Sequence, residues 1–191
     1  MATPADAFIS LLEVLDRMEI PYLVGSSVAS AVHGISRPTM DADIVADLRR
    51  DQVDEFVGLL QSSFYADAST IKDALDRRRS FNLIHFQSTF KIDIFPLHQD
   101  DYSRTSFARR RFEESRSLGS EPIECAIATP EDTILRKLEW YRAGGETFER
   151  QWNDLRGVLK VSGDQLDREY LRRWAEYLKI GDLLERLLAE E

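Results

Sequence analysis

The sequence has a single cysteine, no long apolar run and no excess of basic residues. Cys125 is the only cysteine among 191 residues, so an intramolecular disulfide is impossible and a reducing, cytoplasmic setting is expected. No apolar stretch approaches the ~20 residues that a membrane-spanning helix needs, so no membrane partner is expected. The acids Asp6, Glu13 and Asp16 also argue against a signal peptide at the N-terminus.

The charge balance limits the partners of the chain. Lys and Arg number 25 against 34 Asp and Glu, which gives a net charge of −9. Non-specific coating of DNA depends on cationic side chains at the phosphates and is not expected here. A phosphate-rich ligand can still bind through a local basic patch or a divalent metal. The runs Arg77-Arg78-Arg79 and Arg109-Arg110-Arg111 are either solvated faces balanced by acids or docking strips for RNA or a polyphosphate.

Hydrophobic periodicity predicts an α/β (α+β) chain. The pattern indicates a helix over 8–18, strands over 22–24 and 41–46 with a short helix between them, and a helix from residue 51. Two strands over 81–86 and 90–95 are close enough to form a hairpin, and 123–128 is a further strand. Residues 64–80 are polar without a clear period, and 100–120 are expected to mix loop with a short helix.

The C-terminal third is expected to be helical. Thr129-Pro130-Glu131-Asp132 is typical of a helix start, with Thr as the N-cap and Pro at the first position. We therefore expect a small mixed sheet flanked by helices over 1–128 and a C-terminal helical bundle over 129–191 packed on that core. Four aromatic residues at helical spacing are expected in the core: Trp140, Tyr141, Trp152 and Trp174. The strand residue Cys125 is expected to be buried as well.

Three aspartates are the candidates for chemistry. Asp41 and Asp43 lie two residues apart on an expected strand, so their side chains leave the same face. Asp93 is a lone acid in a second apolar strand. If the strands are neighbours, the three carboxylates can converge on Mg²⁺ or Mn²⁺, because hard cations prefer oxygen ligands. Burying three acids together without such a cation is costly.

A glycine and a serine precede these acids. Gly25-Ser26 follows the first expected strand and opens a helical turn. A glycine there lets the backbone approach a phosphate closely, and the helix N-terminus and the Ser26 hydroxyl can bind phosphate oxygens. The alternatives are an ordinary turn at Gly25-Ser26, a solvated strand edge at Asp41 and Asp43, and a structural ion pair of Asp93 with Lys91 or with an arginine.

The ordered set of Gly25-Ser26, Asp41-Ala42-Asp43 and Asp93 resembles the nucleotidyltransferase superfamily, which includes DNA polymerase β. The resemblance spans roughly residues 20–160. The flanking sequence is most similar to the AbiEii/AbiGii toxin-like nucleotidyltransferases, where a later lysine and a following aspartate are also functional. Lys137 and Asp154 match those positions. The group often carries a further acid where this chain has Gln151.

The resemblance implies a metal-dependent enzyme that transfers a nucleoside monophosphate from an NTP to a hydroxyl acceptor. It implies Asp41, Asp43 and Asp93 as metal ligands and Lys137 as a further catalytic residue. Gly25, Ser26, Lys137 and Asp154 would bind the nucleotide. The implied acceptor is tRNA or a protein, with an antitoxin protein as a possible partner. A small-molecule acceptor stays open.

Other interpretations compete with this one. A haloacid-dehalogenase phosphatase also uses Asp-x-Asp, but its apolar strand precedes the acids, whereas Ile44 to Ala46 follows them here. The metal-binding Asp-x-Asp of a sugar transferase lacks the Gly-Ser element. Lys137 can be simply amphipathic, and Asp154 can interact with a helix dipole. A catalytically idle module that binds nucleotide or a partner protein, or a domain whose acids are structural, also remains open.

Overall fold

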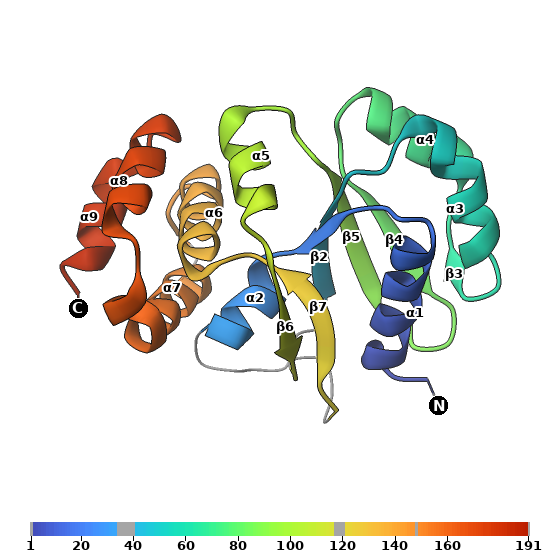
Figure 1. Ribbon diagram of the computed structural model, residues 1–191, viewed down its shortest axis with the longest axis horizontal. Helices are drawn as coiled ribbons and strands as arrows, with labels where there is room; N and C mark the ends of the chain where they lie inside the picture. Colours follow the sequence, from blue (N-terminus) through green and yellow to red (C-terminus); the bar gives the residue numbers. More distant parts are fainter. Residues whose placement is uncertain (1, 34–40, 117–120, 148, 191) are drawn as a thin grey trace.

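Seven strands form one sheet in the part of the chain that the structure describes, with helices on its faces and at one end (Figure 1). The computed structural model describes residues 2–33, 41–116, 121–147 and 149–190; the side chains at 26, 27, 30, 31 and 41 lie outside the description. Within these ranges, no helix combines the length and apolar character that crossing a membrane requires.

The elements follow the predicted order with several additions. The helices are α1 (Pro4–Arg17), α2 (Ser26–His33), α3 (Val53–Leu60), α4 (Ala68–Asp76), α5 (Asp101–Ala108), α6 (Pro130–Ala143), α7 (Glu149–Ser162), α8 (Arg168–Tyr177) and α9 (Gly181–Leu188), with 3-10 turns η1 (Arg50–Gln52) and η2 (Gly163–Gln165). The strands are β1 (Tyr22–Val24), β2 (Asp41–Ala46), β3 (Phe64–Tyr65), β4 (Phe81–His85), β5 (Lys91–Pro96), β6 (Arg111–Ser115) and β7 (Ile123–Ile127).

The sheet is mixed, as the sequence predicts. Its strand order is β3-β4-β5-β2-β1-β7-β6. Strands β2 and β5 pair in parallel, as do β1 and β7, and the other neighbours are antiparallel. The predicted hairpin is confirmed as β4 and β5. Because β2 lies between β1 and β5, the segment after β1 and the acids of β2 and β5 come from adjacent strands.

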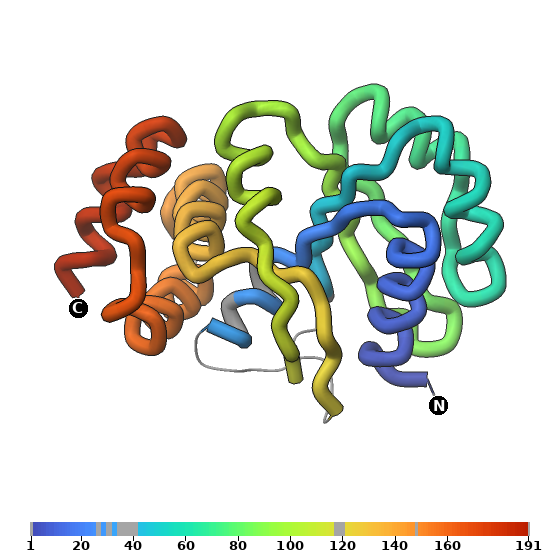
Figure 2. The backbone as a smooth tube through the Cα atoms, viewed as in Figure 1, coloured from blue at the N-terminus to red at the C-terminus, as the bar shows by residue number. Residues whose placement is uncertain are grey.

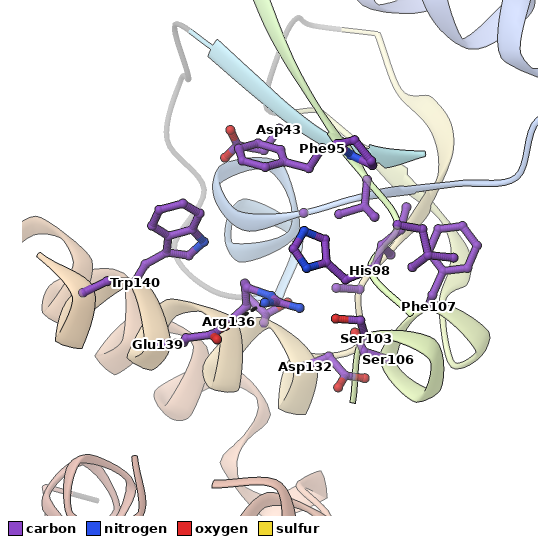
Figure 3. Close-up of a pocket in the computed structure, with 18 of the residues that line it drawn as sticks. Asp43, Phe95, His98, Ser103, Ser106, Phe107, Asp132, Arg136, Glu139 and Trp140 are labelled. Carbon is purple, nitrogen blue, oxygen red and sulfur yellow. Dashed lines mark hydrogen bonds and ion pairs between the residues drawn. The ribbon is translucent and has the colours of Figure 1, made fainter. Parts of the chain in front are cut away.

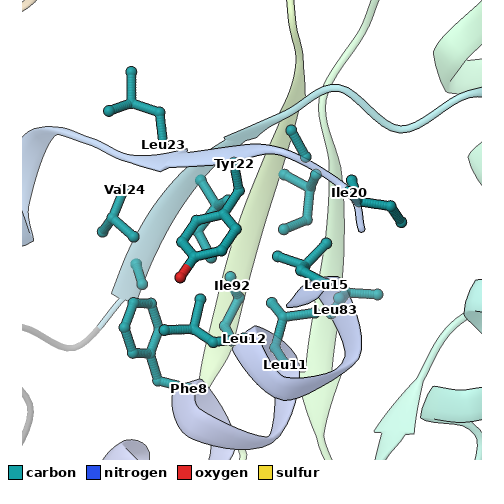
Figure 4. Close-up of a cluster of buried hydrophobic side chains, with 14 of the residues drawn as sticks. Phe8, Leu11, Leu12, Leu15, Ile20, Tyr22, Leu23, Val24, Leu83 and Ile92 are labelled. Carbon is teal, nitrogen blue, oxygen red and sulfur yellow. The ribbon is translucent and has the colours of Figure 1, made fainter. Parts of the chain in front are cut away.

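Strand alternation gives the sheet one buried face and one face that carries acids. Ala42, Ile44, Ile92 and Ile94 are at most 1% exposed. Helix α1 packs on this side through its apolar stripe, where Phe8, Leu11 and Leu15 meet side chains of the sheet (Figure 4). The intervening residues of β2 and β5 therefore point to the opposite face. Asp43 and Asp93 belong to that second set.

The C-terminal helices α6 to α9 gather at the end of the molecule away from the N-terminus (Figures 1 and 2). Helix α6 starts as predicted: Thr129 is its N-cap, and its hydroxyl accepts a hydrogen bond from the Asp132 N–H at 3.3 Å. The buried side chains form two clusters, one within residues 7–128 and one made of Tyr102 and residues 134–187. The division into a core over 1–128 and a helical region over 129–191 remains a prediction.

Two expectations about local structure need correction, and residues 64–80, for which the sequence pattern gave no assignment, have regular structure. Residues 64–80 contain β3 and α4, and the second arginine run enters an edge strand, β6, instead of a loop. The pattern of β6 gave no strand signal because it pairs with β7 alone and alternates poorly, with Phe112 64% exposed. Trp140 was predicted in the core, which is wrong: it is 48% exposed, whereas Trp152 and Trp174 are buried.

The buried thiol of β7 gives a prediction about alkaline pH. Burial raises the pKa of Cys125 to about 12, so the native thiol keeps its proton while the unfolded thiol loses it from about pH 8.5. The unfolded state then binds fewer protons, so the free energy of unfolding should fall as pH rises through this window. Urea unfolding across pH 8 to 11 should show a shallower fall for Cys125→Ala; identical slopes would contradict the assignment.

Candidate functional site

Asp43 and Asp93 lie side by side on the open face of the sheet. They are paired residues in the parallel register of β2 and β5, so their side chains leave the same face from neighbouring strands. Asp41 begins β2 and is paired with Lys91, but its side chain lies outside the described residues. The structure thus brings together two of the three predicted carboxylates and leaves the place of the third open.

Gly25 joins this row from β1. Its N–H donates a hydrogen bond of 3.0 Å to the carbonyl oxygen of Asp43, which fixes the turn between β1 and α2 beside the acid. Apart from Gly25 itself and its two chain neighbours, no described residue has an atom within 4 Å of the position that a Cβ on Gly25 would occupy. The absence of a side chain therefore leaves open space. Ser26 is the first residue of α2, and its side chain lies outside the description.

Asp93 also forms the ion pair that the alternative interpretation anticipated. Lys91 Nζ lies 2.7 Å from Asp93 Oδ2, and the two side chains are 47% and 21% exposed. A pair this exposed contributes at most about 1 kcal/mol, so it does not account for an acid at this position. Sequence reasoning missed Asn82, which is paired with Asp93 across β4 and β5 and extends the polar row. Only the strand register reveals it.

The donor set suits a hard divalent cation. Asp43 and Asp93 supply carboxylate oxygens on adjacent strands, which are the ligands that Mg²⁺ and Mn²⁺ prefer. No group of three acidic, histidine or cysteine side chains is arranged for a metal within the described residues, from which the Asp41 side chain is missing. The open space at Gly25 is on the same row. The residues present therefore fit a cation that also contacts a phosphate.

Lys137 and Asp154 meet, but inside the helical bundle. Lys137 Nζ donates to Asp154 Oδ2 at 2.9 Å between α6 and α7, and the two side chains are only 5% and 13% exposed. Helix α2 packs against both of these helices. The pair therefore lies next to the helix that starts at Ser26. Neither residue lines the large cavity described next.

A cavity of about 560 Å³ opens between the sheet and α6 (Figure 3). Gly25 and Asp43 lie at its sheet side, and Gln151 of α7 lines it as well. Its other lining residues are Leu23, Val45, Phe95, Pro96, Leu97, His98, Ser103, Ser106, Phe107, Ala128, Asp132, Thr133, Arg136, Glu139, Trp140 and Ala143. A volume of this size suits a small-molecule ligand. Asp93 is not among the lining residues.

Helix α6 turns one face toward this cavity. Arg136 and Trp140 both line it from α6 (Figure 3). Arg136 Nη1 donates to Glu139 Oε2 at 2.6 Å, and its guanidinium carbon lies 5.1 Å from the centre of the Tyr102 ring. The cation of α6 that reaches the cavity is therefore Arg136, which sequence reasoning passed over in favour of Lys137.

A buried acid ties the neighbouring elements to α6. Asp132 accepts hydrogen bonds from the Tyr170 hydroxyl at 2.7 Å and the Thr129 hydroxyl at 2.9 Å. Burial raises the pKa of Asp132, although these hydrogen bonds and Arg109 oppose the shift. Arg109 also pairs with Glu131 at 3.0 Å and stacks over the Tyr170 ring at 3.8 Å. Arg109 is thus engaged in contacts within the protein, so fewer side chains of the run Arg109-Arg110-Arg111 are left to bind an external polyanion.

Comparisons with known proteins support the fold. No family model matches the chain, and no curated protein matches its sequence. The antibiotic-resistance factor ANT(2'')-Ia is 14% identical with a TM-score of 0.52, covering 97% of this chain and 96% of that chain. An antigenic nucleotidyltransferase-like protein from Paracoccidioides brasiliensis is 15% identical with a TM-score of 0.52, covering 96% and 92%. The chain therefore has the nucleotidyltransferase fold.

The Lys137–Asp154 pair predicts a loss of stability. Lys137→Met would remove the ion pair that Asp154, only 13% exposed, forms between α6 and α7, which should cost about 3 kcal/mol. We expect thermal unfolding to drop by about 6–12 °C. Adding Asp154→Leu should recover part of the loss, because the double variant buries no lone charge. A double variant that is as unstable as the sum of both single changes would contradict a coupled pair.

The carboxylate row predicts binding of Mg²⁺ or Mn²⁺. Metal at 100 times its dissociation constant should stabilise the wild type by about 2.7 kcal/mol, measured by thermal unfolding. Asp43→Asn should abolish this gain, whereas Asp73→Asn, which changes an exposed acid paired with Arg77, should keep it. Lys91→Met should strengthen metal binding, because Lys91 competes for Asp93. Equal stabilisation of Asp43→Asn and the wild type would exclude this site.

Proposed function

We propose that this protein is a metal-dependent nucleotidyltransferase, which transfers a nucleoside monophosphate from an NTP to a hydroxyl acceptor. The observation that carries the proposal is the register that sets Asp43 beside Asp93, with Gly25 hydrogen-bonded to the Asp43 backbone. On this nucleotidyltransferase fold, two carboxylates can bind a metal ion. A glycine turn at the start of a helix can bind the phosphates of a triphosphate held by that metal.

The donor triphosphate would lie at the start of α2. The open space at Gly25 admits a phosphate, and the first backbone N–H groups of α2 point at it with the positive end of the helix dipole. We assign Ser26 to the same phosphates. Lys137 and Asp154 lie in the bundle against which α2 packs, and we assign them to support and charge balance of this phosphate site.

Asp43 and Asp93, together with Asp41, would hold Mg²⁺ or Mn²⁺. The bound metal would neutralise charge on the phosphates and lower the barrier to attack at phosphorus. Asp93 would accept the proton of the acceptor hydroxyl. The acceptor oxygen then forms a bond to the α-phosphorus as the bond to the bridging oxygen of the β-phosphate breaks. The products are the modified acceptor and pyrophosphate.

The acceptor proposed here is a hydroxyl of tRNA or of a protein. Asp93 does not line the cavity and 21% of its side chain is exposed, so part of this carboxylate can be reached from outside the cavity. The resemblance of its motifs to those of the AbiEii/AbiGii toxin-like enzymes leads us to propose a cytoplasmic toxin with an antitoxin protein as its partner. A small-molecule acceptor is the alternative within the same chemistry.

A catalytically idle module is the second candidate. Two observations favour it: the ion pair of Lys91 with Asp93 occupies a predicted metal ligand, and Gln151 lines the cavity where the related pattern often has an acid. Such a module would bind nucleotide without turning it over, so measuring both binding and transfer separates the two candidates.

The test is transfer of label from α-labelled NTPs in the presence of Mg²⁺, with tRNA and with bulk protein as acceptors. We expect incorporation by the wild type and a loss of at least about a thousandfold for Asp43→Asn and Asp93→Asn, because several kcal/mol of charge stabilisation disappear. Asp73→Asn should keep wild-type activity.

A second variant separates the phosphate site from the fold. Gly25→Ala should fold normally, because its added methyl group meets no described atom, yet it should weaken NTP binding by filling the space meant for phosphate. NTP binding without transfer to any acceptor would support the idle module. Neither binding nor transfer by the wild type would overturn both candidates.

A further inference from the structure

Trp140 is a large aromatic side chain in an unexpected place. It lines the cavity from α6 and is 48% exposed, whereas the apolar residues Ile134, Leu135 and Leu138 of the same helix are fully buried. Exposing an indole to water forgoes the free energy that its burial would supply. Packing within α6 therefore does not explain the position of this ring.

The indole is held in place from the sheet side. Phe95 of β5 contacts Trp140 edge-on, with ring centres 6.2 Å apart and planes at 70° (Figure 3). Phe95 follows Asp93 by two residues and thus leaves the same face of the strand. The contact fixes the orientation of the indole while nearly half of its surface stays available to a ligand.

Two buried polar atoms in the same cavity wall have no partner. Among the described residues, neither Thr133 Oγ1 nor Gln151 Oε1 makes a hydrogen bond, although both atoms are buried and Thr133 as a whole is only 1% exposed. Unpaired buried polar atoms are costly and are rare in folded proteins. Both residues line the cavity, so a polar ligand there can supply the missing hydrogen bonds.

We propose that this wall of the cavity binds the nucleobase and ribose of the donor NTP, with the base stacked on Trp140 and polar groups of the nucleoside meeting Gln151 and Thr133. The inference rests on the proposed function. Phe95 is a positioning residue for the indole. Gln151, which departs from the acid of the related pattern, supplies a neutral amide for a neutral nucleoside.

The position of the cavity along the row of acids favours the donor NTP, and not the acceptor, as the ligand of this cavity wall. The cavity contacts Gly25 and Asp43, where the triphosphate would lie, and does not contact Asp93, which faces the acceptor. Trp140 lies on α6 three residues after Lys137, so it extends from the helix that supports the phosphate site. Trp140 also lines the same cavity as Gly25 and Asp43, so a nucleoside that extends from the phosphates into this cavity can reach the indole.

The experiment compares ligands with and without a base. Each of the four NTPs and inorganic tripolyphosphate is titrated, with Mg²⁺, into the wild type and into Trp140→Leu. Stacking on an aromatic ring should make the best NTP bind about tenfold more weakly to Trp140→Leu, with tripolyphosphate unchanged. Trp140→Phe should recover part of the affinity. Phe112→Leu, which removes an exposed ring from the distant strand β6, is the matched control and should bind like the wild type.

Tryptophan fluorescence tests the same contact without a variant. Trp152 and Trp174 are only 4% and 5% exposed, so quenching by acrylamide reports mainly on Trp140. The best NTP should protect the indole from quenching, and tripolyphosphate should not. Protection by the NTP together with weaker binding to Trp140→Leu supports the inference.

The two proposals fail in different ways. Tight NTP binding that neither protects the indole nor weakens in Trp140→Leu would overturn the base site and leave the nucleotidyltransferase proposal standing. An equal loss of tripolyphosphate binding in Trp140→Leu would overturn the base site as well, since it would report general damage to the fold. No binding of any NTP or of tripolyphosphate by the wild type would overturn both.

Discussion

The parallel pairing of β2 with β5 is the constraint on which the site depends. In this register Asp43 is opposite Asp93, and a slip of one residue would turn one of the two acids into the buried face. The register is held by apolar side chains on the other face, where Ala42, Ile44, Ile92 and Ile94 are buried in the sheet cluster. The hydrophobic core thus fixes the distance between two like charges, a placement that their own repulsion opposes.

The second constraint is the order of the strands. Strand β1 pairs antiparallel with β2, so the turn at Gly25 returns to the level of Asp43, and the N–H of Gly25 donates to the Asp43 carbonyl there. Helix α2 then begins beside the acids and packs against α6 and α7. One backbone hydrogen bond between neighbouring strands therefore links the turn at Gly25, the carboxylates and the bundle that carries Lys137.

Local signals in the sequence predicted much of this arrangement. The order Gly25, Asp43 and Asp93, the hairpin of β4 and β5 and the start of α6 follow from turns, alternation and caps, which are properties of short segments. Contacts between residues distant in sequence could not be predicted from these local signals. Asn82 becomes a neighbour of Asp93 only through the register of β4, and Arg109 is engaged by Glu131 and Tyr170 from other helices.

Helical periodicity cannot distinguish a side chain in the core from one that lines a cavity, as Trp140 illustrates. A stripe of apolar residues marks a side of a helix that avoids water, but it does not say whether a core or a cavity faces that side. Tyr141 and Trp140 are adjacent in sequence, and only Tyr141 is buried. Lys137 was expected at the nucleotide because of the family resemblance, whereas Arg136 is the cation of α6 that lines the cavity.

The cavity is lined on one side by residues of the sheet cluster, such as Leu23, and on the other by α6, whose buried residues Ile134, Leu135 and Leu138 belong to the bundle cluster. A ligand that fills the cavity contacts both the sheet side and α6, and it loses its binding site once either of them unfolds. A ligand bound in the cavity therefore connects the sheet and the bundle. It couples the melting of the sheet to the melting of the bundle, so that the loaded protein should lose both in a single, more cooperative transition.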